Sequence, residues 1–406
     1  MCIFVTGATD FIGSAVVQEL IEAGHKVIGL ARSDRGAVKL KEAGAEVHQG
    51  SLDDLDSLRS GAAIADGVIH LAAKHDVSDL AGSLATDLQE PSVDTSAATS
   101  RAVRLESFGG PEVLNVREVP VPQAGSGQIR VRVTAAGLNP MDWFMTSDAD
   151  TATRFGLSLP SGFGTDYAGI VDQVGDGVTE FAVGDRVFGG ALSRAVAAYV
   201  VVDVAGTIAA GGDAHHTPDG VDDRTAATLA IAGCTASAAL AVVNPGPDDT
   251  VLIGGAGGGV GVFAVQLARL AGARVIGTGS ATSADALRAL GAEPVTYGDG
   301  MVDRLRALAP AGVTAAIDLY GTDTMQAARE LGVPDERITT IAAQVDGITP
   351  ANGANAAPGA IEEIARLVAA GQLRVPIAAS FPMEQIRAAV ELQAGRHVHG
   401  KVVIDI

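Results

Sequence analysis

The chain of 406 residues contains two cysteines, Cys2 and Cys234, which belong to different apolar segments. A disulfide framework and a cysteine-based zinc site both need cysteines at defined spacings, so both are excluded. The eight histidines are scattered, and we interpret the adjacent pair His215 and His216 as part of a polar loop. The sequence therefore predicts a protein without a metal site.

Basic residues are also scarce, with 28 lysines and arginines against 48 acidic residues, for a formal net charge of −20. A surface of this sign repels nucleic acids and anionic membranes, so neither is an expected partner. No apolar run reaches the roughly 18 residues that span a bilayer, and the chain enters an apolar strand directly after Met1 without a basic leader. We therefore expect a cytoplasmic protein.

The length suits two or three domains, and the 47% hydrophobic and 19% charged composition is typical of a soluble α/β protein. The most informative stretch is a glycine-rich turn at 254–261, which lies between a predicted strand at 251–253 and a predicted helix at 262–270, with another strand at 274–277. Glycines allow the backbone to approach a pyrophosphate, and a helix N-terminus attracts the phosphate charge. The same glycines could form only a tight turn, but their placement favours a dinucleotide site with a floor of Gly257, Gly258, Gly259, Val260 and Gly261.

Residues 1–90 alternate predicted strands and helices, which indicates a separate parallel α/β unit. The glycine motif at 4–14, together with segments 29–34 and 50–54, resembles the first half of the epimerase branch of the short-chain dehydrogenases. This resemblance implies a second dinucleotide site at Gly7, Phe11 and Ile12, where Arg32 would meet the 2′-phosphate of NADPH and Asp53 the adenine.

This N-terminal unit departs from the epimerase pattern in two ways. Asp10 replaces a glycine that should approach the pyrophosphate, and the chain's four tyrosines, including the nearest, Tyr167, all lie outside the unit. Independent catalysis is therefore not expected. We predict a half-fold used for docking or solubility, which packs on its own helix at 78–88 or on the rest of the chain.

Small polar residues at 91–100 predict a linker, and short valine-rich strands punctuated by glycine and proline follow it. We expect a mostly antiparallel β domain at 101–220 and 346–406, and a dinucleotide-binding domain at 221–345 that begins with one helix at 226–243. The segment 400–406 is predicted to be a closing strand that returns to the β domain.

Blocks at 136–142, 164–169, 183–189, 254–261 and 400–403 resemble, in family order, the zinc-independent quinone oxidoreductases of the medium-chain dehydrogenase/reductase family, which include the zeta-crystallins. The resemblance implies a GroES-like β domain and a Rossmann domain with the cofactor between them. Zinc-dependent relatives carry a cysteine near Asn139 and a histidine and glutamate near Thr165 and Asp166. Their absence here disfavours metal-assisted chemistry.

The same resemblance assigns the site residues. Asn139 and Thr235 would lie beside the nicotinamide, although Asn139 could form only a turn before Pro140, and Thr235 could equally cap or pack its helix. The remaining cofactor contacts would come from Ser280 and Tyr297 near the adenosine and from Ile341 and Ala342, while the substrate pocket would contain Trp143, Phe144 and Tyr167. No catalytic acid or base is identified.

No acidic residue follows the strand that ends at Gly277, which favours NADPH, with NADH possible. The sequence thus predicts a homodimeric enzyme that reduces quinones or conjugated carbonyl compounds by direct hydride transfer. Reduction of an enoyl thioester is the alternative reaction. An NADPH-binding sensor or structural protein with little turnover is the alternative from another class.

Overall fold

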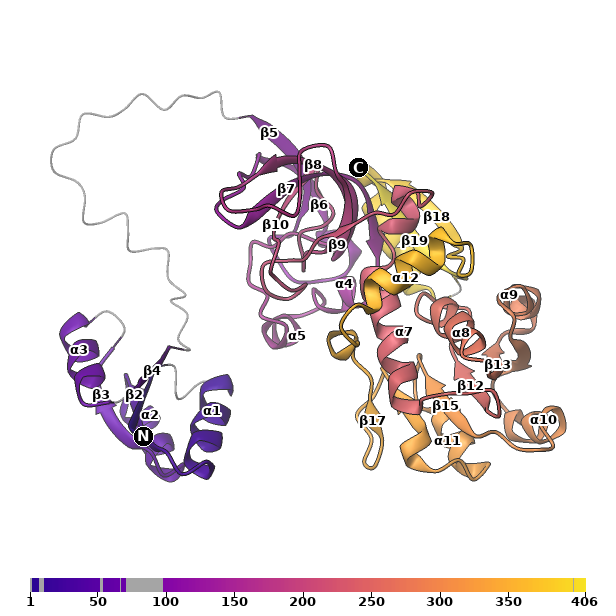
Figure 1. Cartoon of the computed structure of the whole chain (residues 1–406), viewed down its shortest axis with the longest axis horizontal. Helices are drawn as coiled ribbons and strands as arrows, with labels where there is room; N and C mark the ends of the chain where they lie inside the picture. Colours follow the sequence, from indigo (N-terminus) through magenta and orange to yellow (C-terminus); the bar gives the residue numbers. More distant parts are fainter. Residues whose placement is uncertain (1, 7–10, 52–53, 66, 71–97, 397) are drawn as a thin grey trace. The chain divides into compact units, whose positions relative to one another are not determined.

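The computed structural model in Figure 1 describes residues 2–6, 11–51, 54–65, 67–70, 98–396 and 398–406. The chain divides into two compact units, Met1–Val93 and Asp94–Ile406. The predicted helix at 78–88 and the residues Gly7, Asp10 and Asp53 lie outside the described residues.

The N-terminal unit is a parallel sheet in the order β3-β2-β1-β4. Its strands are β1 (Cys2–Thr6), β2 (Lys26–Ala31), β3 (Glu46–Gln49) and β4 (Gly67–His70), and its helices are α1 (Phe11–Glu22), α2 (Asp34–Glu42) and α3 (Leu55–Ala63). Successive residues of β1 point to opposite faces of the sheet: Val5 packs with Val17 and Leu40, whereas Phe4 packs with Leu58. Both faces are thus covered, which is why β1 and the interior of β2 consist almost entirely of apolar residues. The predicted parallel α/β unit is confirmed.

The larger unit begins with a hairpin of β5 (Thr99–Arg104) and β6 (Asn115–Pro120). The main sheet of the β domain has the order β11-β9-β8-β7-β19-β18, with β10 also paired to β7. Its strands are β7 (Gln128–Leu138), β8 (Asp166–Val174), β9 (Arg186–Gly190), β10 (Tyr199–Asp203), β11 (His215–His216), β18 (Ile377–Pro382) and β19 (Lys401–Asp405). β19 pairs antiparallel with β7, so the predicted return of the C-terminal strand to the β domain is confirmed.

Two short helices, α4 (Pro140–Phe144) and α5 (Ala149–Arg154), connect β7 to β8. The predicted linker at 91–100 is wrong at its end, because Thr99 and Ser100 belong to β5 and Ser100 is buried opposite Val119. Small polar residues looked unsuitable for a strand, but hairpin pairing satisfies their backbone groups.

The second domain is a parallel sheet in the order β14-β13-β12-β15-β16-β17. Its strands are β12 (Thr250–Gly254), β13 (Arg274–Gly279), β14 (Glu293–Thr296), β15 (Ala315–Asp318), β16 (Ile338–Thr340) and β17 (Thr349–Pro350). The helices around it are α7 (Ala230–Val243), α8 (Gly261–Leu270), α9 (Ala284–Leu290), α10 (Met301–Leu308), α11 (Asp323–Glu330) and α12 (Ala360–Ala369). Val251 and Ile253 face one core, and Leu252 faces the other. The predicted Rossmann-type sheet is therefore confirmed.

Two predicted boundaries in this region differ from the structure. The single helix expected at 226–243 is divided into α6 (Asp223–Ala226) and α7, because residues 227–229 leave the α-helix between them. The sheet also continues past residue 345 to β17, and Ile361 and Ile364 of α12 pack in the same core as α7 and α8. Consequently, α12 covers the dinucleotide-type domain, and only the later segment, with α13 (Ile386–Ala394), returns to the β domain.

In the described part of the chain, no helix combines the length and apolar character required to cross a membrane.

Candidate dinucleotide and substrate site

The glycine-rich turn joins β12 to α8 with very close backbone packing. A side chain on Gly261 would place its Cβ 2.3 Å from the carbonyl oxygen of Gly255, and one on Gly254 would lie 2.3 Å from Thr324 Oγ1. A Cβ on Gly258, by contrast, would meet only the Gly255 oxygen, at 3.3 Å. The inner glycines thus form a compact support, while Gly258 leaves open space beside the N-terminus of α8. This arrangement fits a pyrophosphate.

The start of β19 lies against this turn. The Gly400 N–H donates to the carbonyl oxygen of Gly257 at 2.9 Å, and Lys401 Cδ lies 3.3 Å from the position of a Cβ on Gly259. The exposed imidazole of His399 is similarly close, with Nδ1 3.0 Å from the position of a Cβ on Gly257. The C-terminal strand therefore contacts the predicted dinucleotide site directly, which the sequence did not reveal.

The other predicted cofactor residues lie at the same edge of the sheet. Ser280 follows β13, and the Tyr297 N–H, after β14, donates to the Gly279 carbonyl oxygen at 3.3 Å. The Tyr297 side chain is 53% exposed. Ile341 and Ala342 directly follow β16. Ligands of open parallel sheets bind beyond the carboxyl ends of the strands, so the structure gathers these candidates where a dinucleotide would lie.

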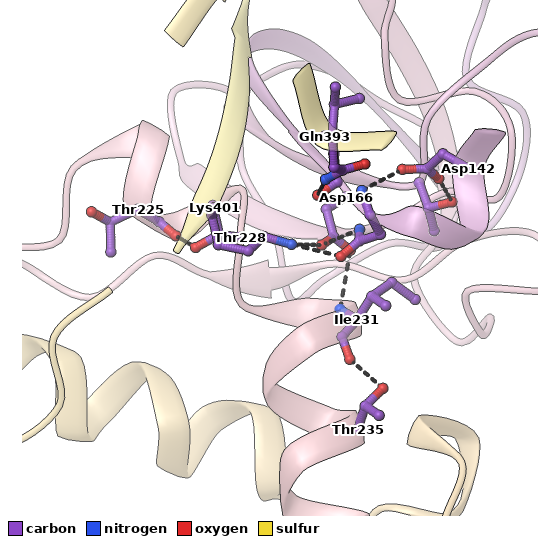
Figure 2. Close-up of polar contacts among 11 residues, drawn as sticks. Asp142, Asp166, Thr225, Thr228, Ile231, Thr235, Gln393 and Lys401 are labelled. Carbon is purple, nitrogen blue, oxygen red and sulfur yellow. Dashed lines mark hydrogen bonds and ion pairs between the residues drawn. The ribbon is translucent and has the colours of Figure 1, made fainter. Parts of the chain in front are cut away.

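Five polar residues form what we call the buried polar cluster, drawn in Figure 2. They are Asn139, Asp142, Thr165, Asp166 and Lys401, which are all at most 3% exposed. Asn139 follows β7 and precedes α4, Asp142 belongs to α4, Thr165 and Asp166 lie at the start of β8, and Lys401 begins β19. The cluster thus joins three strand ends of the β domain.

The hydrogen bonds of the cluster are short and complementary. Asn139 Nδ2 donates to Asp166 Oδ2 at 2.9 Å, and Lys401 Nζ donates to Asn139 Oδ1 at 2.6 Å. Asp142 accepts from the Asn139 backbone N–H at 2.8 Å and from Thr165 Oγ1 at 2.6 Å. Every charged group in the cluster therefore has a partner, as buried charges require.

Burial dominates the electrostatics of the cluster. It raises the pKa of Asp142 to about 7 and that of Asp166 to about 6, against the opposing effects of Thr165 on Asp142 and of Lys401 on Asp166. Burial also lowers the pKa of Lys401, although both carboxylates counteract it. Burial thus disfavours the charged form of all three groups, and the hydrogen bonds and opposite charges within the cluster oppose that effect.

Asp166 also connects the cluster to the second domain. Its Oδ1 accepts from the Ile231 N–H in the first turn of α7 at 3.1 Å, and Thr235, one turn later, donates from Oγ1 to the Ile231 carbonyl oxygen at 2.6 Å (Figure 2). The structure thus links Asn139 to Thr235 through Asp166. The Thr235 hydroxyl thus bonds to the backbone of its own helix, and its place beside the nicotinamide stays a prediction.

Two of the three predicted substrate residues remain candidates. Trp143 Nε1 donates to Gln393 Oε1 at 3.1 Å, which fixes the half-buried indole. Phe144 is 49% exposed and makes an edge-to-face contact with Phe155, which is also exposed and was not predicted from the sequence. This aromatic pair offers an apolar surface beyond the end of α4.

The prediction that Tyr167 lines the substrate pocket is wrong. Tyr167 is 0% exposed, lies in the core of the β domain and donates its hydroxyl to the carbonyl oxygen of Asp213 at 2.7 Å. Because side chains alternate along β8, Asp166 faces the polar cluster while Tyr167 faces the opposite side.

The second site proposed in the N-terminal unit stays a prediction. Arg32 is exposed after β2, and Phe11 and Ile12 begin α1. Elsewhere, an open depression of about 700 Å³ includes Arg186, Asp223, Arg224 and Asp405, but these charges pair with one another and none is a predicted site residue. Among the residues that the structure describes, no group of three or more His, Cys, Asp and Glu side chains could hold a metal ion.

Comparison with protein families identifies three regions. The alcohol dehydrogenase GroES-like domain matches residues 125–199, a family described as zinc-binding dehydrogenase matches 290–404, and the NAD dependent epimerase/dehydratase family matches 3–89. The quinone oxidoreductase of Rattus norvegicus is 38% identical over 182 residues, which cover 44% of this chain and 52% of the relative. The chain thus spans about half the length of the curated relatives that it matches.

Solved structures match a larger part of the chain. The quinone oxidoreductase from Coxiella burnetii has a TM-score of 0.67 at 28% identity and covers 76% of this chain and 100% of its own. An NAD-dependent alcohol dehydrogenase has a TM-score of 0.64, also at 28% identity, and covers 75% of this chain and 99% of its own.

A GroES-like domain joined to a Rossmann-type domain, with a glycine-rich turn at the carboxyl edge of the parallel sheet, defines the class of two-domain dehydrogenases and reductases. The larger unit is similar in sequence and fold to quinone oxidoreductases of the medium-chain dehydrogenase/reductase family, and a region similar to the epimerase/dehydratase family, residues 3–89, precedes it. The recognition made from the sequence motifs is confirmed.

Proposed function

We propose that the chain is an NADPH-dependent reductase of quinones or conjugated carbonyl compounds that works without zinc. The main support is that β19 brings the glycine-rich turn next to the buried polar cluster. Gly400 bonds to the turn, and the next residue, Lys401, bonds to Asn139 in the cluster. A site for pyrophosphate thus adjoins a polar side chain fixed at the domain boundary. When bound, NADPH supplies the hydride, and solvent supplies the proton that completes the hydroquinone.

The residues of the chain hold and orient the cofactor. Gly257 to Gly261 and the N-terminus of α8 would bind the pyrophosphate, and Ser280 and Tyr297 would lie near the adenosine. The Arg304 guanidinium donates to the carbonyl oxygens of Thr296 and Asp299, at 2.8 Å each, and so holds the loop that carries Tyr297. These contacts would help to orient a bound cofactor.

The donor set of the buried polar cluster disfavours a zinc ion. An amide and a hydroxyl, from Asn139 and Thr165, are poor zinc ligands compared with thiolate and imidazole. The Lys401 ammonium lies 2.6 Å from Asn139 Oδ1, so a divalent cation on that oxygen would meet a fixed positive charge. Hydride transfer without a metal depends instead on positioning.

The acceptor surface is proposed at Phe144 and Phe155, beside the fixed indole of Trp143. Exposed aromatic rings suit a flat, apolar acceptor such as a quinone. No carboxylate or basic residue follows β13 directly, and the hydroxyls of Ser280 and Thr282, 2.9 Å apart, tolerate a 2′-phosphate. NADPH is therefore preferred to NADH.

Initial rates with a quinone, an alkenal and a crotonyl thioester, each with NADPH and with NADH, test this proposal. We expect the quinone or the alkenal with NADPH to be fastest. A Ser280→Asp variant should shift preference toward NADH, because its carboxylate repels the 2′-phosphate and accepts from the ribose hydroxyl; Asp285→Asn, on the exposed face of α9, is the control. Turnover of the thioester alone, or NADPH binding without oxidation by any acceptor, would overturn the proposal.

A further inference from the structure

Lys401 is a buried ammonium that precedes three buried apolar residues, Val402 to Ile404, in β19. It is 2% exposed, and its Nζ lies 2.6 Å from Asn139 Oδ1 and 3.8 Å from Asp166 Oδ2. Burying an ammonium is costly, and replacing a buried ion pair with apolar residues is often neutral or stabilising. Stability alone therefore gives little reason to place a lysine here.

The ion pair fixes the orientation of the Asn139 amide. Lys401 donates to its oxygen and Asp166 accepts from its nitrogen, at 2.6 and 2.9 Å. A flipped amide would set N–H groups against the ammonium and its carbonyl oxygen against the carboxylate. A charged residue on each side thus selects one of the two amide orientations.

The two charged residues also contact the second domain. The Lys401 side chain lies against Gly259 of the glycine-rich turn, and Asp166 Oδ1 accepts from the Ile231 N–H of α7. Asn139 is therefore held in register with the turn and with the helix that carries Thr235. A shift of either domain would be transmitted to its amide.

We propose that Lys401 and Asp166 are positioning residues, which act through Asn139 to set the orientation of the bound nicotinamide. This inference rests on the proposed function and assigns roles to residues known from the sequence only as parts of motifs. By the resemblance stated from the sequence, Asn139 and Asp166 stand near positions where zinc-dependent relatives carry metal ligands. Here Asp166 instead pairs with Lys401 and accepts from the Asn139 amide.

A double-mutant cycle on the full chain tests this inference, with Lys401→Met, Asn139→Ala and the combined variant. We expect Lys401→Met to lower kcat by about 10- to 100-fold, as small misplacements in active sites do. The dissociation constant of NADPH should change by less than about threefold, since the glycine-rich turn still binds the pyrophosphate. The same substitution in the Asn139→Ala background should change kcat by less than about twofold, because the residue through which it acts is gone.

Two further readouts separate positioning from a purely structural role. The fluorescence emission of bound NADPH reports the environment of the nicotinamide. Lys401→Met should change this emission in the parent background but not in the Asn139→Ala background. The midpoint of thermal unfolding should instead respond to Lys401→Met in both backgrounds. Arg274→Met is the matched control: it removes one positive charge and the ion pair with Glu293 at the opposite end of the sheet, and kcat should be unchanged.

If Lys401→Met does not fold, a variant that carries both Lys401→Met and Asp166→Asn removes the two opposite charges together. This double variant then takes the place of Lys401→Met in the double-mutant cycle. Equal effects on kcat and on NADPH emission in both backgrounds would overturn the inference. An effect confined to NADPH affinity would also overturn it. If the parent oxidises no NADPH with any acceptor, the proposed function is wrong. The double-mutant cycle measured by NADPH emission still decides whether Lys401 and Asp166 act through Asn139.

Discussion

The glycine-rich turn allows a prediction that separates cofactor binding from folding. Gly258→Ala should weaken NADPH binding without affecting the stability of the fold. Gly261→Ala should mainly lower the stability of the fold. The difference follows from what each new Cβ would meet. On Gly261 it would lie 2.3 and 2.5 Å from the carbonyl oxygens of Gly255 and Ala256, whereas on Gly258 it would meet only one oxygen, at 3.3 Å.

The magnitudes follow from the atoms in contact. Overpacking costs about 1–3 kcal/mol, and backbone oxygens cannot move aside as side chains can, so Gly261→Ala should cost about 3 kcal/mol. For the larger unit, Asp94–Ile406, an unfolding entropy of about 2.1 cal/mol/K per residue converts this into a fall in Tm of about 5 °C. Gly258→Ala should stay within about 0.5 kcal/mol of the parent. Loss of a backbone contact to a charged phosphate, about 1.5 to 3 kcal/mol, should weaken NADPH binding by about 10- to 100-fold.

Differential scanning calorimetry and titration of NADPH fluorescence measure the two effects. Gly246→Ala, before the amino end of β12, is the control, because its Cβ would meet only Asp249 Oδ2, at 3.9 Å; it should leave both quantities unchanged. Parental NADPH affinity in Gly258→Ala, or a parental Tm in Gly261→Ala, would refute the assignment of inner and outer glycines.

Four further predictions concern other parts of the chain. Burial lowers the pKa of His215, but Asp213 and Glu362 outweigh it and the net shift is upward from 6.5. The two carboxylates therefore stabilise the fold fully below pH 6.5, where His215 is protonated, and this contribution is lost as the pH rises through the raised pKa. The difference in Tm between the parent and His215→Gln should decrease over the same pH range. Tyr167→Phe should cost about 1 kcal/mol in urea unfolding, by loss of the bond to Asp213, without changing NADPH affinity. Because β17 is an edge strand, light scattering should give the mass of a homodimer, and a monomer would contradict this. Deleting residues 1–95, which leaves β5 intact, should preserve quinone reduction while lowering solubility or Tm; loss of turnover in a folded protein would refute the separation of the two units.

The parallel sheets could be predicted closely because two independent signals agree in them. Strands such as 251–253 are apolar at every position because both faces are covered, and glycines mark their ends. The boundary between α6 and α7 could not be found in this way. Ala227, Thr228 and Leu229 are as buried as their neighbours, so the pattern of buried residues continues where the helix does not.

The buried polar cluster could be predicted only in part. Asn139 was identified from its motif, but its partners Asp166 and Lys401 lie 27 and 262 residues away, and only the fold brings them together. The sequence placed Lys401 only in the closing strand at 400–406 and gave it no partner. Its burial depends on carboxylates from distant elements, and no local pattern reports that.

The position of β19 also bears on how the two domains move. Asp166 in the β domain bonds to the Ile231 N–H at the start of α7, while Lys401 bonds to Asn139 and lies against Gly259. Opening the domains at this point would break the bond from the Ile231 N–H to Asp166 Oδ1, while Asp166 Oδ2 would keep its bond to Asn139. A buried group left unsatisfied costs about 1–3 kcal/mol. The cluster therefore resists such opening. The relative placement of the glycine-rich turn and Asn139 is set by these contacts within the chain, so a cofactor meets a geometry that is already formed.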